Sequence, residues 1–339
     1  MNRKFLPLVI LLTASILLAD CSFPRIRLTQ ATQTPMPLTP TDTAPPPLPT
    51  AELGLAENPL ILALPPSASK PEQIAAAQEI ASQFTERTGY VVVTVIPDSY
   101  AALADALEKG NAHIVLLDPY SYALAYQKDL VRASYAVLKD GKGKYGAQFI
   151  ATRKGGFKSY FDMNIDKNTA DAGVALAQFA DKKPCWSDET SPSGYIIPLG
   201  YLNKNQIITK PAAFVQGHPT VVRSLYVGGI CDFGATYIDA RKFPSLEDQF
   251  PDLMEQVIVV WRIPDIIPYD VFAFSTNMPQ GMRDLFANTI PAIMQTDAGK
   301  AAFKTAFGIE ELQAVNDGDY DEFRTYVDES RIDLSTLVK

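Results

Sequence analysis

A repeated alternation of strand and helix patterns limits the fold of this chain more than any other feature. The apolar run 59–64 leads into a helical spacing of apolar residues that stops at Gly89, and the β-branched stretch 90–97 follows. A second helical segment at about 99–109 then precedes the apolar run 113–118. Strands that alternate with helices in this way form a parallel sheet with helices on both faces. The sequence therefore predicts an α/β lobe at the start of the globular part.

The same alternation returns after residue 145 and continues to the end of the chain. Strand patterns are found at 145–153, 184–188, 230–236, 256–263 and 269–275, and helical patterns at 169–180, 193–204, 217–229, 279–294, 296–306 and 319–330. We expect two lobes, 58–146 with 268–339 and 147–267, with the last helices returning to the first lobe. Two hinge crossings, near 146–150 and 262–268, would leave a ligand cleft between the lobes.

The first 21 residues have the layout of an export signal. Two basic residues precede an uncharged run from Phe5 to Ala19, which is shorter than the roughly 20 residues that span a membrane. The tetrapeptide LADC at 18–21 resembles a bacterial lipobox, although Asp20 departs from the Gly or Ala that is usual there. We expect a lipoprotein signal peptide with a lipidated Cys21; an uncleaved anchor helix is the alternative. Either one places the chain outside the cytoplasm, on the face of the bacterial cell membrane.

Residues 22–57 are expected to form a disordered tether. The stretch is rich in Thr and Pro and holds too few large apolar residues to build a core. It would connect the membrane anchor to the globular body.

Composition argues against several classes of function. The net charge is −8, and no stripe of Lys and Arg provides the basic footprint that nucleic acids require. Cys185 and Cys231 are an even pair in an oxidising compartment, so they are either joined in a disulfide or buried as separate thiols. With two histidines and no Cys-x-x-Cys motif, we expect neither a structural metal nor a cofactor. The lack of a Gly-x-Ser-x-Gly elbow and of a P-loop argues against an enzyme.

Polar residues gather where predicted strands lead into helices, which is where α/β sheets bind ligands. In the segment DETSPSGYIIPLGYL, the hydroxyls of Ser191 and Ser193 and the amides that begin the helix could hold a tetrahedral oxyanion without a lysine. The alternative is that one of these serines only caps the helix. Further candidates at such junctions are Tyr100, Tyr120, Tyr122, Gly194, Tyr195, His218, Thr236, Asp239 and Asp270.

Most of these side chains also have a simpler explanation. The tyrosines could be core aromatic residues, and His218 could be a surface residue at a helix start. The carboxylates of Asp239 and Asp270 could be solvated. In the functional interpretation, His218 donates to the anion, and the two aspartates accept from a protonated oxygen or a cationic group of the ligand.

Four segments carry a resemblance to a known family. They are PDSYAALADALEKGNAHIVLLDPYSYALA, SPSGYIIPLGYL, GHPTVVRSLYVGGICDFGAT and VVWRIPDIIPYDVFAF. From about residue 58 to 300 the chain resembles the phosphonate- and phosphite-binding subunits of ABC importers, which are type II periplasmic binding proteins. The resemblance implies an extracytoplasmic protein that captures a small oxyanion (phosphonate, phosphite or phosphate-like) by hinge closure and delivers it to an ABC permease. By position it assigns ligand contacts to Tyr100, Ser191, Ser193, Gly194, His218, Asp239 and Asp270, with Tyr120 and Tyr122 beside them.

Two positions depart from the family's pattern. Pro192 stands where the family has Thr, which removes a hydroxyl and an N–H from the anion grip. Asp118 stands where Gly is usual, and a carboxylate there would repel a dianion. The same cleft would also suit a ligand-sensing lipoprotein that presents its closed form to a membrane receptor or histidine kinase.

Overall fold

The computed structural model describes residues 52–68 and 70–338. The expected signal peptide, the lipidation site Cys21 and most of the expected tether lie outside these ranges. The last residues of the expected tether belong to the folded part of the chain. Leu53 packs against the core of the first lobe, and the Gly54 carbonyl accepts from the Val91 amide. No helix within the described ranges combines the length and the apolar character that a membrane crossing requires.

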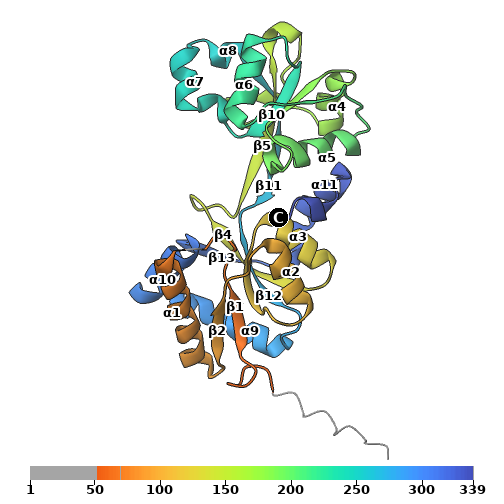
Figure 1. Cartoon of the computed structure of the whole chain (residues 1–339). Coiled ribbons are helices and arrows are strands. Elements are labelled where there is room, and N and C mark those ends of the chain that lie inside the picture. Colours follow the sequence, from red (N-terminus) through yellow and green to blue (C-terminus); the bar gives the residue numbers. More distant parts are fainter. Residues whose placement is uncertain (1–51, 69, 339) are drawn as a thin grey trace, which may run out of the picture. The chain divides into compact units, whose positions relative to one another are not determined.

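The first lobe is built on a six-stranded sheet in the order β13-β4-β12-β3-β1-β2 (Figure 1). Its strands are β1 (Leu60–Ala63), β2 (Val92–Val95), β3 (Ile114–Leu117), β4 (Val131–Leu138), β12 (Val271–Ser275) and β13 (Glu311–Ala314). The first three strands are parallel, as the alternation predicts, whereas β12 runs antiparallel to both β3 and β4. The sheet is therefore mixed, because a strand that returns from the second lobe inserts into it.

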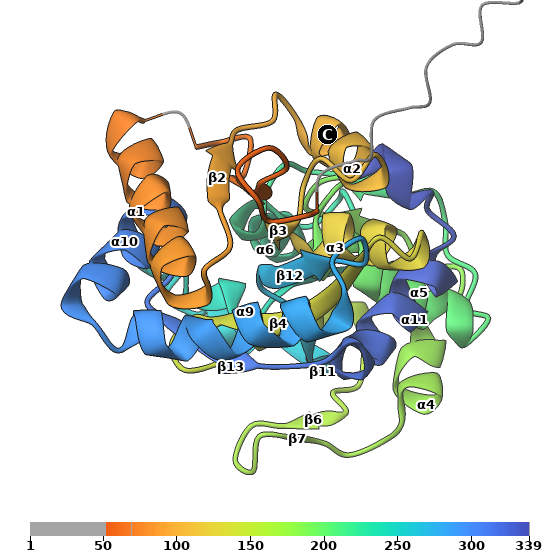
Figure 2. The same ribbon diagram turned by 90° about the horizontal axis from the view of Figure 1, so that it is seen from below.

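Helices cover both faces of this sheet, as expected (Figure 2). One face carries α1 (Pro71–Thr88), α9 (Gln280–Met294) and α10 (Asp297–Phe307), and the other carries α2 (Tyr100–Glu108) and α3 (Pro119–Gln127). Phe84, Phe286 and Phe303 are fully buried on the first face, and Leu107 is buried on the second. Burial of each such side chain stabilises the lobe by about 1.5–3 kcal/mol.

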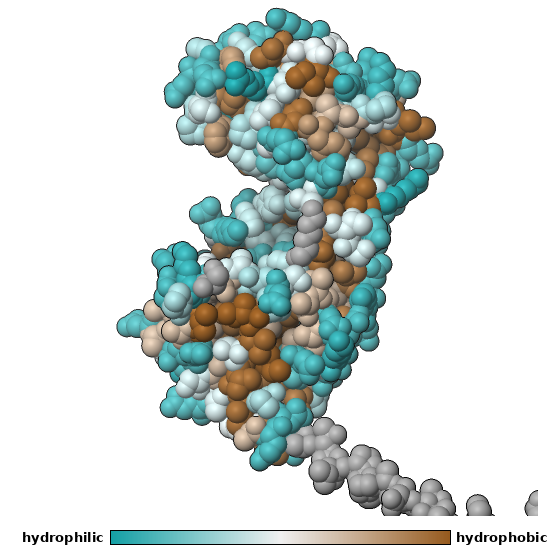
Figure 3. Space-filling model, in the orientation of Figure 1, coloured by the Kyte–Doolittle hydropathy of each residue, from teal (hydrophilic) through white to brown (hydrophobic). Residues whose placement is uncertain are grey.

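The outer strand of the first sheet leaves apolar side chains at the surface. Val93 and Val95 on β2 are exposed, and Figure 3 shows an apolar area over this strand. β2 ends the strand order, so its outer edge has no strand neighbour within the described residues.

The second lobe is built on a five-stranded sheet in the order β11-β5-β10-β8-β9. Its strands are β5 (Lys144–Thr152), β8 (Pro184–Trp186), β9 (Ala213–Phe214), β10 (Phe233–Tyr237) and β11 (Val257–Pro268). One face packs on α4 (Ala172–Leu176) and α5 (Ile197–Lys204), and the other on α6 (His218–Val227), α7 (Pro244–Gln249) and α8 (Leu253–Gln256). A hairpin of β6 (Phe161–Asp162) and β7 (Lys167–Asn168), which the sequence did not predict, is hydrogen-bonded to β11.

The chain crosses between the two sheets twice, through residues 139–143 and 269–270. The sequence placed these crossings at 146–150 and 262–268. β5 and β11 pair with each other from Lys144 and Pro268 to Ala147 and Ile263, so the expected hinge residues lie in or next to this two-stranded connection, and their role in a hinge stays a prediction. The two-lobe arrangement with two crossings is nevertheless the one expected.

The last helix, α11 (Asp321–Ser330), packs between the lobes: Phe323 and Arg324 contact Tyr120 and Tyr126 of α3 in the first lobe, and the helix also packs on α5 of the second. The Tyr326 ring stacks on Tyr201 of α5 with 3.7 Å between the ring centroids. Gly200 permits this approach, because a Cβ at that position would lie 2.1 Å from the Tyr326 carbonyl oxygen. The segment 268–339 thus contributes α9 and α10 to the first lobe, as expected, and α11 contacts both lobes.

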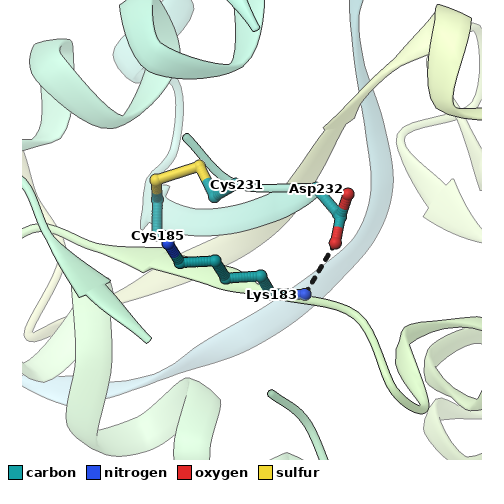
Figure 4. Close-up of a disulfide and its surroundings, with 4 residues drawn as sticks. All are labelled: Lys183, Cys185, Cys231 and Asp232. Carbon is teal, nitrogen blue, oxygen red and sulfur yellow. Dashed lines mark hydrogen bonds between the residues drawn. A yellow bond between two sulfur atoms is a disulfide. The ribbon is translucent and has the colours of Figure 1, made fainter. Parts of the chain in front are cut away.

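Cys185 and Cys231 are joined in a disulfide with 5.6 Å between their Cα atoms (Figure 4). Of the two alternatives left open by the sequence, the structure has the bonded one. Next to the disulfide, the Asp232 carboxylate accepts from the Lys183 amide at 2.7 Å. Together these contacts fix the start of β8 to the segment that leads into β10.

Candidate ligand-binding site

A tight turn precedes α5 and contains the two serines singled out in the sequence. The Ser191 hydroxyl accepts from the Gly194 amide at 3.0 Å, which is the geometry of a helix cap. Residues Pro192–Ile196 then form a single π-helical turn before α5 begins. Ser191 therefore caps the turn, which is the simpler of the two explanations given for it. Ser193 is buried and its hydroxyl faces a different neighbour, Tyr145.

Gly194 brings three segments into contact. A Cβ at this position would lie 1.9 Å from the Ser187 hydroxyl oxygen and 2.9 Å from Cε1 of His218. Ser187 directly follows β8, and His218 begins α6, so the carboxyl end of one strand meets two helix starts here. Ser187 is fully buried, and its hydroxyl has no hydrogen-bond partner. A buried hydroxyl without a partner lowers the stability of the fold unless a group from outside the protein forms a hydrogen bond with it.

The sequence did not single out Ser187. The pattern PCWSD predicts a strand over 184–188, which places Ser187 within the strand rather than after it. The structure ends β8 at Trp186. A serine directly after a strand end is the signal that would have identified it.

His218 is oriented by the backbone of β10. Its Nδ1 accepts from the Tyr237 amide at 3.4 Å, and its ring packs edge-on against the Tyr237 ring. Nε2 therefore carries the proton and lies 3.4 Å from the Ser191 hydroxyl. Burial lowers the pKa of His218, and the nearby Asp188 carboxylate opposes this effect. The ring is thus a neutral donor near pH 7.

Two tyrosine hydroxyls lie near this turn. Burial raises the pKa of Tyr145 to about 12, and its hydrogen bond with Ser193 opposes the rise. The Tyr120 hydroxyl is buried without a partner, and burial, with smaller effects from Tyr145, Asp118 and Asp188, raises its pKa. Both groups are therefore protonated donors. The sequence does not indicate a ligand contact for Tyr145, because this residue is only the first residue of a predicted strand.

A second cluster lies on the first lobe and is acidic. Burial, then the charges of Asp118 and Asp270, raises the pKa of Tyr100 to about 12. Burial and Asp118 also raise the pKa of Asp270, while Lys139 opposes them. Asp118 accepts from the Tyr120 and Ser121 amides at 2.9 and 3.1 Å, so its own carboxylate occupies the N-terminus of α3.

Asp239 does not have the free carboxylate that the sequence suggested. Arg241 donates to both of its oxygens, at 2.9 Å from Nε and 2.6 Å from Nη2, and Gln148 donates to it at 2.7 Å. Burial alone would raise the pKa of Asp239, but Arg241 and Gln148 outweigh it and hold the pKa below its usual value. Arg241 supplies the positive charge that balances Asp239. The sequence analysis did not identify this pair.

Three other predicted contacts serve packing in this structure. The Tyr122 ring is fully buried, and its hydroxyl donates to Asp317 at 2.7 Å. The Thr236 hydroxyl is buried and donates to the Tyr237 carbonyl at 2.9 Å. The Tyr195 ring packs against Trp186 and Phe214. Within residues 52–68 and 70–338, no group of three or more His, Cys, Asp or Glu side chains is arranged to hold a metal ion.

A family described as "ABC transporter, phosphonate, periplasmic substrate-binding protein" matches residues 62–320. The chain belongs to this family. It is therefore an extracytoplasmic substrate-binding protein rather than an enzyme, with a small-molecule ligand and a membrane permease as its partner.

Individual relatives agree with this assignment. The chain is 24% identical over 301 residues to the phosphate-import protein PhnD of Mycolicibacterium smegmatis, covering 82% of this chain and 87% of that protein. The solved structure of XAC2383 from Xanthomonas citri bound to ATP has a TM-score of 0.57 and 15% identity, covering 80% of this chain and 98% of that one. The same protein bound to a chloride ion gives 0.56 and 16% over the same shares. These two structures support the two-lobe fold.

Proposed function

We propose that this protein is the solute-capturing lipoprotein of an ABC importer and that it binds a small phosphorus oxyanion between its lobes. The observation that carries the proposal is the convergence of Ser187, Gly194 and His218, where a buried hydroxyl has no hydrogen-bond partner among the residues that the structure describes. The Tyr120 hydroxyl is a second buried donor without a partner. Membership of the phosphonate-binding family supports the choice of ligand class.

In this proposal neutral donors from both lobes hold the oxyanion, with Tyr120 on α3 of the first lobe and the others on the second. Ser193, the Nε2–H of His218 and the Tyr120 and Tyr145 hydroxyls are all protonated near neutral pH. The start of the turn at 192–196 favours negative charge through its helix dipole, while Pro192 has no N–H and the Gly194 amide is already bonded to Ser191. An acidic protein can therefore bind an anion without a lysine or arginine in the site.

Other residues of the first lobe would contact a different part of the ligand. Tyr100 can donate to it, whereas Asp270, with its raised pKa, can accept from a protonated oxygen or an amine. Asp118 prevents the N-terminus of α3 from taking a second anionic group, because its own carboxylate is already there. The arrangement favours a phosphonate, phosphite or phosphate over a fully deprotonated anion such as sulfate.

The remaining parts of the proposal concern anchoring and motion. Lipidation of Cys21 and the tether that follows would keep the protein near its permease. The crossings at 139–143 and 269–270 are short, and a ligand that contacts both lobes would favour the state in which they are closed on it.

A thermal-shift screen tests the proposed ligand class. A ligand that binds only the folded protein raises the melting temperature. Methylphosphonate, aminoethylphosphonate, phosphite and phosphate are compared with sulfate at equal concentration. We expect the largest shift from a phosphorus compound; equal shifts, or sulfate ahead of all four, would contradict the proposal. The matched variant Ser193→Ala with His218→Ala should lose the shift.

A further inference from the structure

A cavity of about 590 Å³ lies against the two crossings. Lys142 lines it from the first crossing, Tyr269 from the second, and the β6–β7 hairpin contributes a further wall. Its volume lies within the range of about 300–1,000 Å³ that is usual for small-molecule sites. Of the residues proposed above to hold the phosphorus oxyanion, it shares only Tyr145. The cavity therefore adjoins the proposed oxyanion site at Tyr145, and its other lining residues are its own.

Cationic side chains from three different segments line this cavity. They are Lys142 on the first crossing, Lys167 on the hairpin and Arg262 on β11. Two carboxylates, Asp166 and Asp265, line it as well, so three positive and two negative charges leave a net charge of +1. The protein as a whole carries −8, which makes a positive cavity a local exception.

The carboxylates leave these cations available. Lys142 pairs with Asp265 at 2.8 Å and Arg262 with Asp166, but the side chains of these two aspartates are 44% and 78% exposed. Arg262 also lies 4.0 Å from the buried carboxylate of Asp239, which pairs more closely with Arg241. Exposed ion pairs are weak, so an anion inside the cavity can compete for the cations. Lys167 makes no ion pair within the described part of the chain.

Arg262 is held in place by contacts other than its ion pair. Its guanidinium lies 4.1 Å from the centroid of the Phe161 ring. Its amide donates to the Asn168 side chain at 2.9 Å, and its carbonyl accepts from that side chain at 2.7 Å. The Nε–H is buried without a partner. A planar, pre-oriented guanidinium with unused donor capacity suits a carboxylate, sulfonate or phosphate group.

The rest of the lining is apolar or aromatic. Tyr145 and Tyr269 stack with 5.0 Å between ring centroids, and Phe161, Ile238 and Pro264 complete these walls. We propose that this cavity is a second small-molecule site, which takes an organic anion that has one acidic group and a flat apolar body. The acidic group would lie at Arg262 and Lys167, and the apolar body would contact the aromatic walls.

Titration calorimetry with naphthalene-1-sulfonate tests this site in the purified protein. We expect one saturable site, which Lys167→Gln and Arg262→Gln each weaken by about fivefold or more. Lys158→Gln changes the charge equally but lies outside the cavity lining, and it should leave the affinity unchanged.

Three outcomes would overturn the proposal. They are the absence of saturable binding, equal affinity for the cation 1-naphthylmethylammonium, and affinities that neither variant alters. Arg262 also packs on Phe161, so its replacement changes packing as well as charge. Lys167 is exposed, and Lys167→Gln keeps the test decisive if Arg262→Gln unfolds the protein. Circular dichroism of each variant establishes that it is folded.

Discussion

Gly194 approaches Ser187 so closely that a Cβ at position 194 would lie 1.9 Å from the Ser187 hydroxyl oxygen. This contact joins the end of β8 to the turn before α5. It also places the unpartnered Ser187 hydroxyl next to the ring of His218. The close packing of these three residues is the structural basis of the proposed oxyanion site, and it can be tested by adding one methyl group.

Gly194→Ala should weaken binding of the phosphorus ligand by tenfold or more and cost about 1–3 kcal/mol of stability, because the new methyl group displaces Ser187 or His218. Titration calorimetry and thermal denaturation measure the two effects. Gly281→Ala is the control, since a Cβ there meets nothing within 4 Å. Unchanged affinity in Gly194→Ala would show that the three-residue contact has no part in binding.

The two aspartates that the sequence assigned to the ligand should behave differently. Asp239→Asn leaves the buried Arg241 without its counter-charge and should destabilise the protein by about 3–5 kcal/mol. Asp270→Asn should reduce ligand affinity with a smaller effect on stability, because no ion pair is lost. Chemical denaturation and calorimetry on both variants separate these roles. A reversed pattern would return Asp239 to the ligand site.

Asp118→Gly should open the N-terminus of α3 to anions. Replacing an N-cap aspartate by glycine costs only a few tenths of a kcal/mol, and it removes a negative charge beside Tyr100 and Asp270. We expect phosphate to bind more tightly to Asp118→Gly than to the wild type, as measured by calorimetry. Asp284 is an exposed residue of α9, so Asp284→Asn removes a charge at the surface and should have no effect on phosphate binding. Weaker phosphate binding by Asp118→Gly would mean that Asp118 itself accepts from the ligand.

Stability should decrease as the pH falls below about 6.5, the ordinary pKa of histidine. Burial lowers the pKa of His113, whose Nδ1 accepts from the Ile61 amide at 3.0 Å. The unfolded chain therefore binds a proton at His113 at a higher pH than the folded chain does. The stabilising contribution of neutral His113 is complete above pH 6.5 and is lost as the pH falls below it. Melting temperatures at pH 7.5 and 5.5 should differ more for the wild type than for His113→Asn. Equal differences would exclude this role of His113.

Reduction of the Cys185–Cys231 disulfide should lower stability by about 4 kcal/mol, the value that the chain-entropy model gives for a loop of 46 residues. The bond also fixes β8, which leads to Ser187. The double variant Cys185→Ser with Cys231→Ser should therefore melt at a lower temperature than the wild type under oxidising conditions. If both melt at the same temperature, the disulfide does not constrain this lobe.

The sequence predicted the frame of the protein well for a physical reason. β-branched runs and regular helical spacing identify strands and helices locally, and their order predicts the sheet and both lobes. The packing of α11 could not be predicted in this way, because an apolar helix face does not specify that the helix contacts both α3 of the first lobe and α5 of the second. The pairing between β5 and β11 could not be predicted either, since it joins segments that are distant in the sequence.

The site was predicted only in part, because the roles of its side chains depend on distant partners. Tyr122 occupies a predicted ligand position, yet its hydroxyl is bound to Asp317, 195 residues further along the chain. Asp239 lies two residues from Arg241, so this pair could have been recognised from the sequence. Tyr145 becomes a candidate donor only once the fold brings it beside Ser193.

A crystal structure with methylphosphonate tests most directly whether neutral donors from both lobes hold the ligand. We predict that the phosphonate oxygens lie within hydrogen-bond distance of Ser193 and of Nε2 of His218, with Tyr100 contacting the ligand from the first lobe. A phosphonate held instead by lysine or arginine side chains, or one that contacts only a single lobe, would contradict the account.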